Sequence, residues 1–306
     1  MKAAFIYPGQ GAQKTGMGQD FYEKSPLSRM CFDKSSEILG FDMKKLCFEE
    51  NELLNRTDYT QAALVTTCLA MTKEVLKHGI KPAMTAGLSL GEYCALVTAG
   101  CMSYEDAIRT IWIRGNLMNQ ADPNSKGGMS AVLGLSGDQV MKVVSDIEGA
   151  SVANFNCPGQ LVITGEKDAL KTAGLVLKEA GAKRVIPLKV TGPFHSPYMR
   201  EAGEKLYQSL SEVPFRKPEI PYVANVDGEI KTDVANVREL LRDQVSSSVR
   251  WEQSVRAMID AGVDTYVEIG PGKTLSGFMR RIDRGVKSLH ISTWEDLEKV
   301  VEELAE

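Results

Sequence analysis

Residues 83–99, AMTAGLSLGEYCALVTA, decide the fold class. The stretch begins as an apolar strand over 83–88, turns through Gly87-Leu88-Ser89-Leu90-Gly91, and continues as a helix predicted over 90–99. The turn matches G-x-S-x-G, the pattern of a nucleophile elbow, in which a serine occupies a tight strand-to-helix turn. The glycines permit the turn, and the helix N-terminus directs free N–H groups at the serine. A chance match is the alternative, but the strand–turn–helix context favours Ser89 as a nucleophile.

Apolar runs alternate with amphipathic stretches on both sides of this turn, which is typical of an α/β fold with a parallel sheet. The elements predicted in the outer parts of the chain are strands over 2–7, 83–88, 265–269 and 286–291, and helices over 57–77, 90–99, 103–120 and 274–282.

The middle of the chain has a different order, β-α-β-β-α-β, which is that of a ferredoxin-like unit. Its predicted strands are 129–135, 152–155, 160–164 and 184–189, and its predicted helices are 137–147 and 167–180. We therefore expect a discontinuous large α/β domain formed by residues 1–125 and 193–306, with a ferredoxin-like small subdomain over 126–192.

Composition excludes several classes of protein. The 306 residues are 43% hydrophobic and 25% charged, which argues against a disordered, collagenous or coiled-coil chain. A net charge of −4 argues against a dedicated nucleic-acid binder. With no apolar run near the ~20 residues of a membrane span and no signal-peptide pattern, we expect no membrane segment. Six cysteines without paired spacing predict reduced thiols and a cytoplasmic location.

The charge is distributed unevenly. Residues 295–306 carry a net charge of −5 and are expected to form a solvated helix, so the rest of the chain is near +1. Residues 126–192 carry eight basic and six acidic groups. This mildly basic middle part could contact an acidic partner, although a solvated basic face is the simpler interpretation.

A serine nucleophile needs a base, and the chain has only three histidines. His78 follows a predicted helix end and is expected to be a solvated cation, while His290 lies within the last predicted strand. His195 lies in the irregular segment Thr191-Gly192-Pro193-Phe194-His195-Ser196-Pro197, where the small subdomain rejoins the large domain. Because loops at domain junctions commonly carry functional residues, His195 is the candidate base, against the alternative of a hydrogen-bonded loop histidine.

The segment Gly9-Gln10-Gly11-Ala12-Gln13 follows the first strand and exposes backbone N–H groups where α/β sheets bind ligands. A dinucleotide site is disfavoured because Lys14 replaces the third glycine of G-x-G-x-x-G, so an oxyanion donor is the better use of this loop. Residues 270–274 resemble a phosphate-binding loop but lack its first glycine, and no metal-binding motif occurs. Arg114, flanked by apolar residues, either extends to solvent or meets a buried anion.

Taken together, the motifs resemble those of the malonyl-coenzyme A:acyl carrier protein transacylase family of bacterial fatty acid synthesis, over nearly the whole chain. The residues that carry the resemblance are Gly9-Gln10-Gly11-Ala12-Gln13, Gly87-Leu88-Ser89-Leu90-Gly91-Glu92, Arg114, Asn154-Phe155-Asn156-Cys157-Pro158-Gly159-Gln160, Gly192-Pro193-Phe194-His195-Ser196 and Glu268-Ile269-Gly270-Pro271-Gly272.

The resemblance implies a hydrolase-like core and a Ser-His dyad without an acidic third member. It implies that Ser89 is acylated, that His195 is its general base, and that the backbone carbonyl of Gln244 orients His195. It also implies an oxyanion hole formed by the backbone N–H groups of Gln10 and Leu90, with Arg114 binding the malonyl carboxylate.

The implied reaction transfers malonyl from coenzyme A to the phosphopantetheine thiol of acyl carrier protein, with no metal or redox cofactor and with the chain as a monomer. Two positions depart from the family pattern, in which histidine often precedes the nucleophile and a small residue precedes Phe194. Here these positions hold Leu88 and Pro193, and Phe194 itself resembles variants that accept unbranched malonyl. The alternatives left open are a polyketide-type acyltransferase component, a serine thioesterase or hydrolase, and a non-catalytic scaffold.

Overall fold

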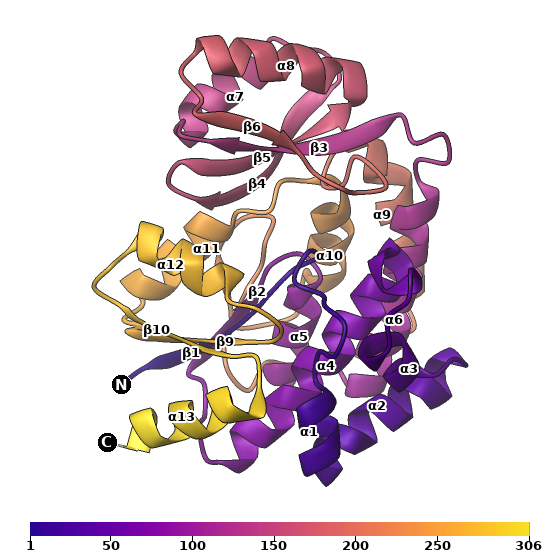
Figure 1. Ribbon diagram of the computed structural model, residues 1–306, viewed down its shortest axis with the longest axis vertical. Helices are drawn as coiled ribbons and strands as arrows, with labels where there is room; N and C mark the ends of the chain where they lie inside the picture. The colour runs from indigo at the N-terminus through magenta and orange to yellow at the C-terminus, as the bar shows by residue number, and fades with distance from the viewer. Residues whose placement is uncertain (306) are drawn as a thin grey trace.

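The computed structural model describes residues 1–305 and contains two separate β-sheets (Figure 1). The larger sheet has the strand order β10-β9-β1-β2-β7-β8, and its first five strands are parallel to one another. Only β8 runs antiparallel. The strands are β1 (Ala3–Tyr7), β2 (Met84–Gly87), β7 (Tyr222–Val223), β8 (Ile230–Lys231), β9 (Thr265–Ile269) and β10 (Lys287–Ile291). The prediction of an α/β fold with a parallel sheet is confirmed.

The central strands β1, β2 and β9 are buried at every residue, because helices cover both faces of the sheet. The helices outside the second sheet are α1 (Gln19–Lys24), α2 (Pro26–Leu39), α3 (Met43–Phe48), α4 (Thr57–Lys77), α5 (Gly91–Thr98), α6 (Tyr104–Gln120), α9 (Arg200–Leu210), α10 (Val237–Ser246), α11 (Trp251–Asp260), α12 (Thr274–Ile282) and α13 (Trp294–Ala305), with short 3₁₀ turns at Leu53–Asn55 and Pro197–Met199. No helix within residues 1–305 is long and apolar enough to cross a membrane.

The second sheet is antiparallel and has the order β4-β5-β3-β6. Its elements are β3 (Gly127–Leu133), α7 (Gly137–Ser145), β4 (Ala150–Cys157), β5 (Gln160–Glu166), α8 (Lys167–Glu179) and β6 (Arg184–Pro187). Helices α7 and α8 cover its outer face, where they enclose a separate apolar core (Figure 1). The opposite face is turned toward the larger sheet.

Two backbone hydrogen bonds join strand β4 of the second sheet to the segment that precedes α11. The Phe155 N–H donates to the Val249 carbonyl (2.9 Å), and the Val249 N–H donates to the Ala153 carbonyl (2.8 Å). Val249 lies just before α11, so strand β4 is held against the larger part of the molecule. This attachment fixes the side chains of β4 relative to those of the parallel sheet.

The acidic C-terminal segment forms α13, but the expectation of a solvated helix is wrong for one of its faces. Leu297 and Val300 are buried because the helix packs its apolar stripe on the main core. Trp294 also lies against the ring of Phe21, with 5.3 Å between the ring centroids.

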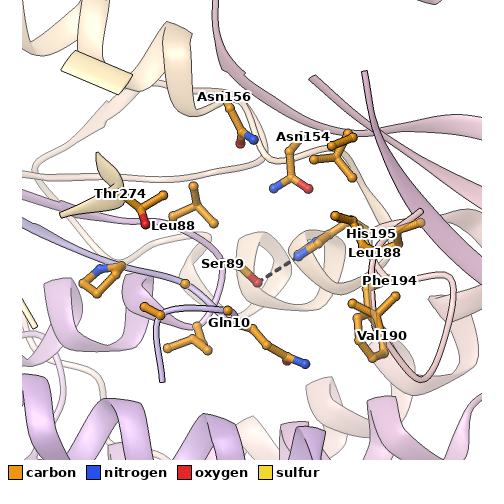
Figure 2. A pocket seen from close by; sticks show the side chains of 18 of the residues that line it. Gln10, Leu88, Ser89, Asn154, Asn156, Leu188, Val190, Phe194, His195 and Thr274 are labelled. Carbon is orange, nitrogen blue, oxygen red and sulfur yellow. Dashed lines mark hydrogen bonds between the residues drawn. The ribbon is translucent and has the colours of Figure 1, made fainter. Parts of the chain in front are cut away.

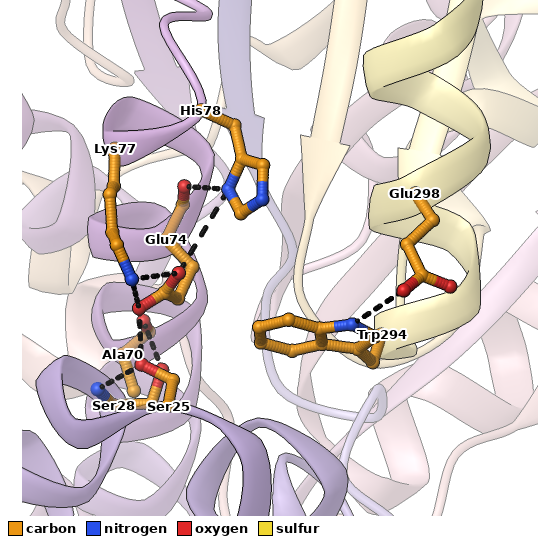
Figure 3. A network of polar contacts seen from close by, with 8 residues as sticks. All are labelled: Ser25, Ser28, Ala70, Glu74, Lys77, His78, Trp294 and Glu298. Carbon is orange, nitrogen blue, oxygen red and sulfur yellow. Dashed lines mark hydrogen bonds and ion pairs between the residues drawn. The ribbon is translucent and has the colours of Figure 1, made fainter.

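Close to α13, the buried Glu74 of α4 accepts hydrogen bonds from Ser25 and Lys77, and its backbone carbonyl contacts His78 Nδ1 at 2.9 Å (Figure 3). His78 is the C-cap of α4, and its side chain is 34% exposed. These contacts tie the N-cap of α2 to the end of α4.

Every element predicted from the sequence lies within two residues of its observed bounds. The sequence patterns did not predict α1–α3, α9–α11, β7 or β8. Strands β7 and β8 have two residues each, which is too short for a periodicity to be detected.

Candidate active site

Ser89 lies on the turn between β2 and α5, at the carboxyl end of the parallel sheet. Its φ of 54° is in the left-handed region that favours glycine. The turn is tight enough that a Cβ on Gly87 would lie 2.0 Å from the Gly91 backbone, and one on Gly91 would lie 2.5 Å from the Tyr7 carbonyl oxygen. The glycines of G-x-S-x-G are therefore required by close backbone contact.

His195 faces Ser89 from the segment that follows β6, as Figure 2 shows. Ser89 Oγ lies 2.8 Å from His195 Nε2, and His195 Nδ1 lies 2.8 Å from the backbone carbonyl oxygen of Gln244. Because a carbonyl only accepts, Nδ1 carries the proton and Nε2 is free to accept from the serine hydroxyl. His195 also has a positive φ, 57°.

Arg114 is fully buried in α6 and points at the same serine. Its Nη2 donates to Ser89 Oγ (3.0 Å) and to Gln244 Oε1 (2.9 Å), while its Nη1 donates to Gln61 Oε1 (2.6 Å). Its Nε has no partner within residues 1–305. The adjacent Gly115 lets α6 approach α4, since a Cβ there would lie 2.8 Å from Asp58 Cα. The structure therefore excludes one of the two expectations for Arg114, that its side chain extends to solvent, and places the guanidinium in the interior.

The backbone N–H groups of Gln10 and Leu90 lie on the two loops that border Ser89, and neither donates a hydrogen bond within residues 1–305. Leu88 packs against Gly9 in the first of these loops, as shown by the 2.6 Å between its Cδ2 and the position of a Cβ on Gly9. The residue before the serine therefore contacts the loop that carries Gln10.

A cavity of about 670 Å³ opens above Ser89, between the two sheets. The large part of the chain contributes the loop after β1, the elbow and the start of α12, and the second sheet contributes side chains of β3, β4 and β5. In Figure 2, Asn154 and Asn156 lie above Ser89, and Phe194 lies beside His195 with Leu188 and Val190. Phe194 is buried and lines the cavity.

Burial changes the protonation of the site. Loss of solvent, followed by repulsion from Arg114, lowers the pKa of His195 to about 4, so the imidazole is neutral near pH 7. Loss of solvent also lowers the pKa of Arg114 and raises that of Glu92 to about 7. The site thus combines a neutral base with a buried cation.

Four polar groups around this site were not predicted as functional from the sequence: the side chains of Gln61, Glu92, Asn225 and Gln244. Gln61 immediately precedes the apolar run Ala62-Ala63-Leu64-Val65 of α4, and an amide next to that run is the one signal that could have drawn attention to it. Asn225 follows a two-residue strand and gives no comparable signal.

The structure also gives the positions of the other histidines, the turn at 270–272 and the cysteines, which were considered from the sequence. His78 and His290 lie away from the cavity, and the turn at 270–272 precedes α12, whose first N–H groups are capped by Glu268. All six cysteines are free thiols and are buried. Among residues 1–305, no group of three or more His, Cys, Asp or Glu side chains is arranged to hold a metal ion.

The chain matches the family model for the acyl transferase domain over residues 4–298. It is 42% identical to a malonyl CoA-acyl carrier protein transacylase of Bacillus subtilis, over 100% of this chain and 98% of that protein. The crystal structure of a malonyl CoA-acyl carrier protein transacylase from Clostridium perfringens superimposes with a TM-score of 0.96 at 40% identity, covering 100% of this chain and 98% of the other.

A second solved structure is described as a type II PKS acyl-carrier protein in complex with its malonyl-transacylase. It gives a TM-score of 0.96 at 36% identity and covers 99% of this chain and 100% of the other. The elbow, the buried arginine and these similarities lead to one conclusion: the chain belongs to the malonyl CoA-acyl carrier protein transacylases of the acyl transferase domain family.

Proposed function

We propose that the chain transfers malonyl from malonyl-coenzyme A to the phosphopantetheine thiol of acyl carrier protein through a malonyl-Ser89 intermediate. The observation that carries this proposal is the placement of Ser89 Oγ between His195 Nε2 (2.8 Å) and Arg114 Nη2 (3.0 Å). Ser89 Oγ therefore contacts both a base that can take its proton and a cation that can bind the carboxylate of the malonyl group.

In the first half-reaction, His195 Nε2 takes the Ser89 proton as Oγ attacks the thioester carbonyl. The oxyanion accepts hydrogen bonds from the backbone N–H groups of Gln10 and Leu90, each worth roughly 3–4 kcal/mol to the transition state. The C–S bond then breaks, and His195 returns the proton to the departing coenzyme A thiolate. The Gln244 carbonyl holds the imidazole in orientation throughout.

In the second half-reaction, His195 takes the proton of the carrier thiol, whose sulfur attacks the ester carbonyl of malonyl-Ser89. The C–O bond breaks, and the proton returns to Ser89 Oγ. Nucleophile, base and anion-binding group all come from the chain itself, so we propose that no metal or redox cofactor takes part.

We propose that Arg114 determines the selectivity for the acyl group, because malonyl carries a carboxylate that acetyl lacks. Charged hydrogen bonds are worth roughly 1.5–3 kcal/mol each, and a carboxylate can pair with a guanidinium through two of them. Phe194, which lines the same cavity, is proposed to exclude an α-branched malonyl by its bulk.

Arg114→Ala should therefore slow malonylation of Ser89 by roughly 100-fold and reduce the preference for malonyl over acetyl. The measurement is single-turnover acylation with malonyl- and acetyl-coenzyme A. Arg109→Ala is a matched control, because Arg109 lies in the same helix with a side chain that is 58% exposed. An unchanged malonyl-to-acetyl ratio in Arg114→Ala would refute the role.

The pH dependence of kcat/KM should reflect His195 in the free enzyme. Since the base must be neutral and its pKa is lowered to about 4, activity should persist as the pH falls below the ordinary histidine value and decline near pH 4. A kcat/KM profile measured with a mixed buffer of constant ionic strength tests this expectation. An acid limb near pH ~6.5, the value of a solvated histidine, would contradict it.

The direct test of the proposed function is intact-protein mass spectrometry after mixing the chain with malonyl-coenzyme A. A malonyl adduct that maps to Ser89 and is removed faster by acyl carrier protein than by water supports transfer. Removal by water at the same rate would support the thioesterase alternative, and the lack of any adduct would support the scaffold alternative.

For the architecture, we propose that residues 126–192 form a ferredoxin-like subdomain inserted between two segments, 1–125 and 193–306, of a hydrolase-like domain. Support comes from the order β4-β5-β3-β6 with α7 and α8 on one face, which fits a β-α-β-β-α-β unit. We also propose that the chain is a cytoplasmic monomer whose macromolecular partner is acyl carrier protein.

A further inference from the structure

Glu92 is a buried carboxylate directly behind the elbow that the proposed reaction does not use. It lies in the first turn of α5, and only 1% of its surface is exposed. One oxygen, Oε2, accepts from Gln244 Nε2 (2.6 Å) and from the Asn225 backbone N–H (3.1 Å). Burying a carboxylate is costly unless it is hydrogen-bonded, so both contacts stabilise its position.

The contact between Glu92 and Gln244 determines the orientation of the Gln244 side-chain amide. Its Nε2 donates to Glu92 and to the Ser89 carbonyl (3.0 Å), so its Oε1 faces Arg114 Nη2 (2.9 Å). The reverse orientation would place amide N–H groups against the guanidinium, donor against donor. The orientation of the amide in turn gives Arg114 an acceptor on the side of Ser89.

The contact with Asn225 supports the backbone of the elbow. Asn225 Oδ1 accepts from the Ser89 N–H (2.6 Å), and its Nδ2 donates to the Gly87 carbonyl (2.7 Å). The two residues whose carboxamides bind the Ser89 backbone are therefore both held by Glu92 Oε2, Gln244 through its side-chain Nε2 and Asn225 through its backbone N–H.

We propose that Glu92 is a positioning residue for the malonyl transfer proposed above, on which this inference rests. By holding Gln244 and Asn225, it fixes the direction of the Arg114 guanidinium and the backbone conformation of Ser89. The required property is an acceptor oxygen at the position of Oε2; the negative charge is secondary.

Two conservative variants separate the oxygen from the charge. Glu92→Gln keeps the chain length and can present its Oε1 at the position of Oε2, but it is neutral. Glu92→Asp keeps the charge but withdraws the acceptor by one methylene. We expect Glu92→Gln to acylate Ser89 within a few-fold of wild type, and Glu92→Asp to be slower by about tenfold, or 1.4 kcal/mol.

The readout specific to positioning is the ratio of single-turnover rates with malonyl- and acetyl-coenzyme A. Glu92→Asp should lower this ratio and Glu92→Gln should preserve it, because only malonyl uses Arg114. Glu74→Gln is the control, since Glu74 is also a fully buried carboxylate but lies outside the cavity. It should leave both the rates and the ratio unchanged.

Four results would overturn the proposal: equal losses in the two variants, a larger loss in Glu92→Gln, no loss in either, or a malonyl-to-acetyl ratio that stays constant in Glu92→Asp. The wild-type chain is measured in the same experiment. If it forms no malonyl-Ser89, the proposed function itself fails; if it does, a deviating variant pattern refutes only the role of Glu92.

Discussion

Ser89→Ala should form no malonyl-enzyme and should lose transfer activity by roughly 10⁶-fold, the scale seen when the nucleophile of a serine enzyme is removed. The expectation follows from the two half-reactions proposed above, in which the malonyl group is bound to Ser89 Oγ after it leaves coenzyme A and before it reaches the carrier thiol. Arg114 Nη2 and His195 Nε2 would keep their positions but would have no hydroxyl between them.

Intact mass after incubation with malonyl-coenzyme A, together with the rate of carrier acylation, measures this effect. Ser209→Ala provides the matched control, because Ser209 is half-buried on α9, lies outside the cavity and bonds only to its own helix within residues 1–305. An adduct that persists in Ser89→Ala would place the acyl group on a different residue and would invalidate the scheme.

His195→Ala should cause a loss of activity of similar size, because Ser89 and His195 are proposed to act as one unit. Without Nε2 as acceptor, the hydroxyl has no base, and the departing thiolate has no proton donor. The double variant Ser89→Ala/His195→Ala should be no slower than either single variant, since groups that act together are strongly non-additive.

The affinity for malonyl-coenzyme A should survive in His195→Ala, because the proposed pairing of Arg114 with the malonyl carboxylate does not involve His195. Added imidazole should restore part of the acylation rate by occupying the space that the side chain vacates. His78→Ala controls for the loss of a histidine as such, since His78 lies outside the cavity. Additive losses in the double variant would show that the two residues do not work as a pair.

The elements of the fold were predictable where the pattern was long or strongly periodic. The 21-residue helix α4 and the buried strands β1 and β9 are such cases, and α4 and β9 have the predicted bounds. Helices α1–α3 and α9–α11 were not predicted, although several are amphipathic, because the stretches that contain them carry no distinctive motif. The prediction that the acidic helix α13 is solvated was wrong for one face. Its many acidic residues drew attention away from the apolar stripe that includes Leu297 and Val300.

The candidate site was predictable where a residue type is rare or sits in a recognisable turn, as with Ser89 and His195. The proposed roles of Gln10, Leu90 and Gln244 were expected only through the resemblance, since these residues would act through backbone groups that any residue carries. Glu92 belonged to a quoted motif, yet its partners Asn225 and Gln244 follow it by more than 130 residues, which no local pattern reveals.

The left-handed backbone at Ser89 and at His195 shows how this enzyme balances reactivity against stability. Of the three non-glycine residues with positive φ within residues 1–305, these are two, and each such conformation costs roughly 1–2 kcal/mol. Domains are stable by only about 5–15 kcal/mol in total, so the cost is a substantial share. A chain selected for stability alone would carry glycine at both positions; under the proposed reaction, the serine and histidine side chains are retained in spite of the backbone conformation that they require.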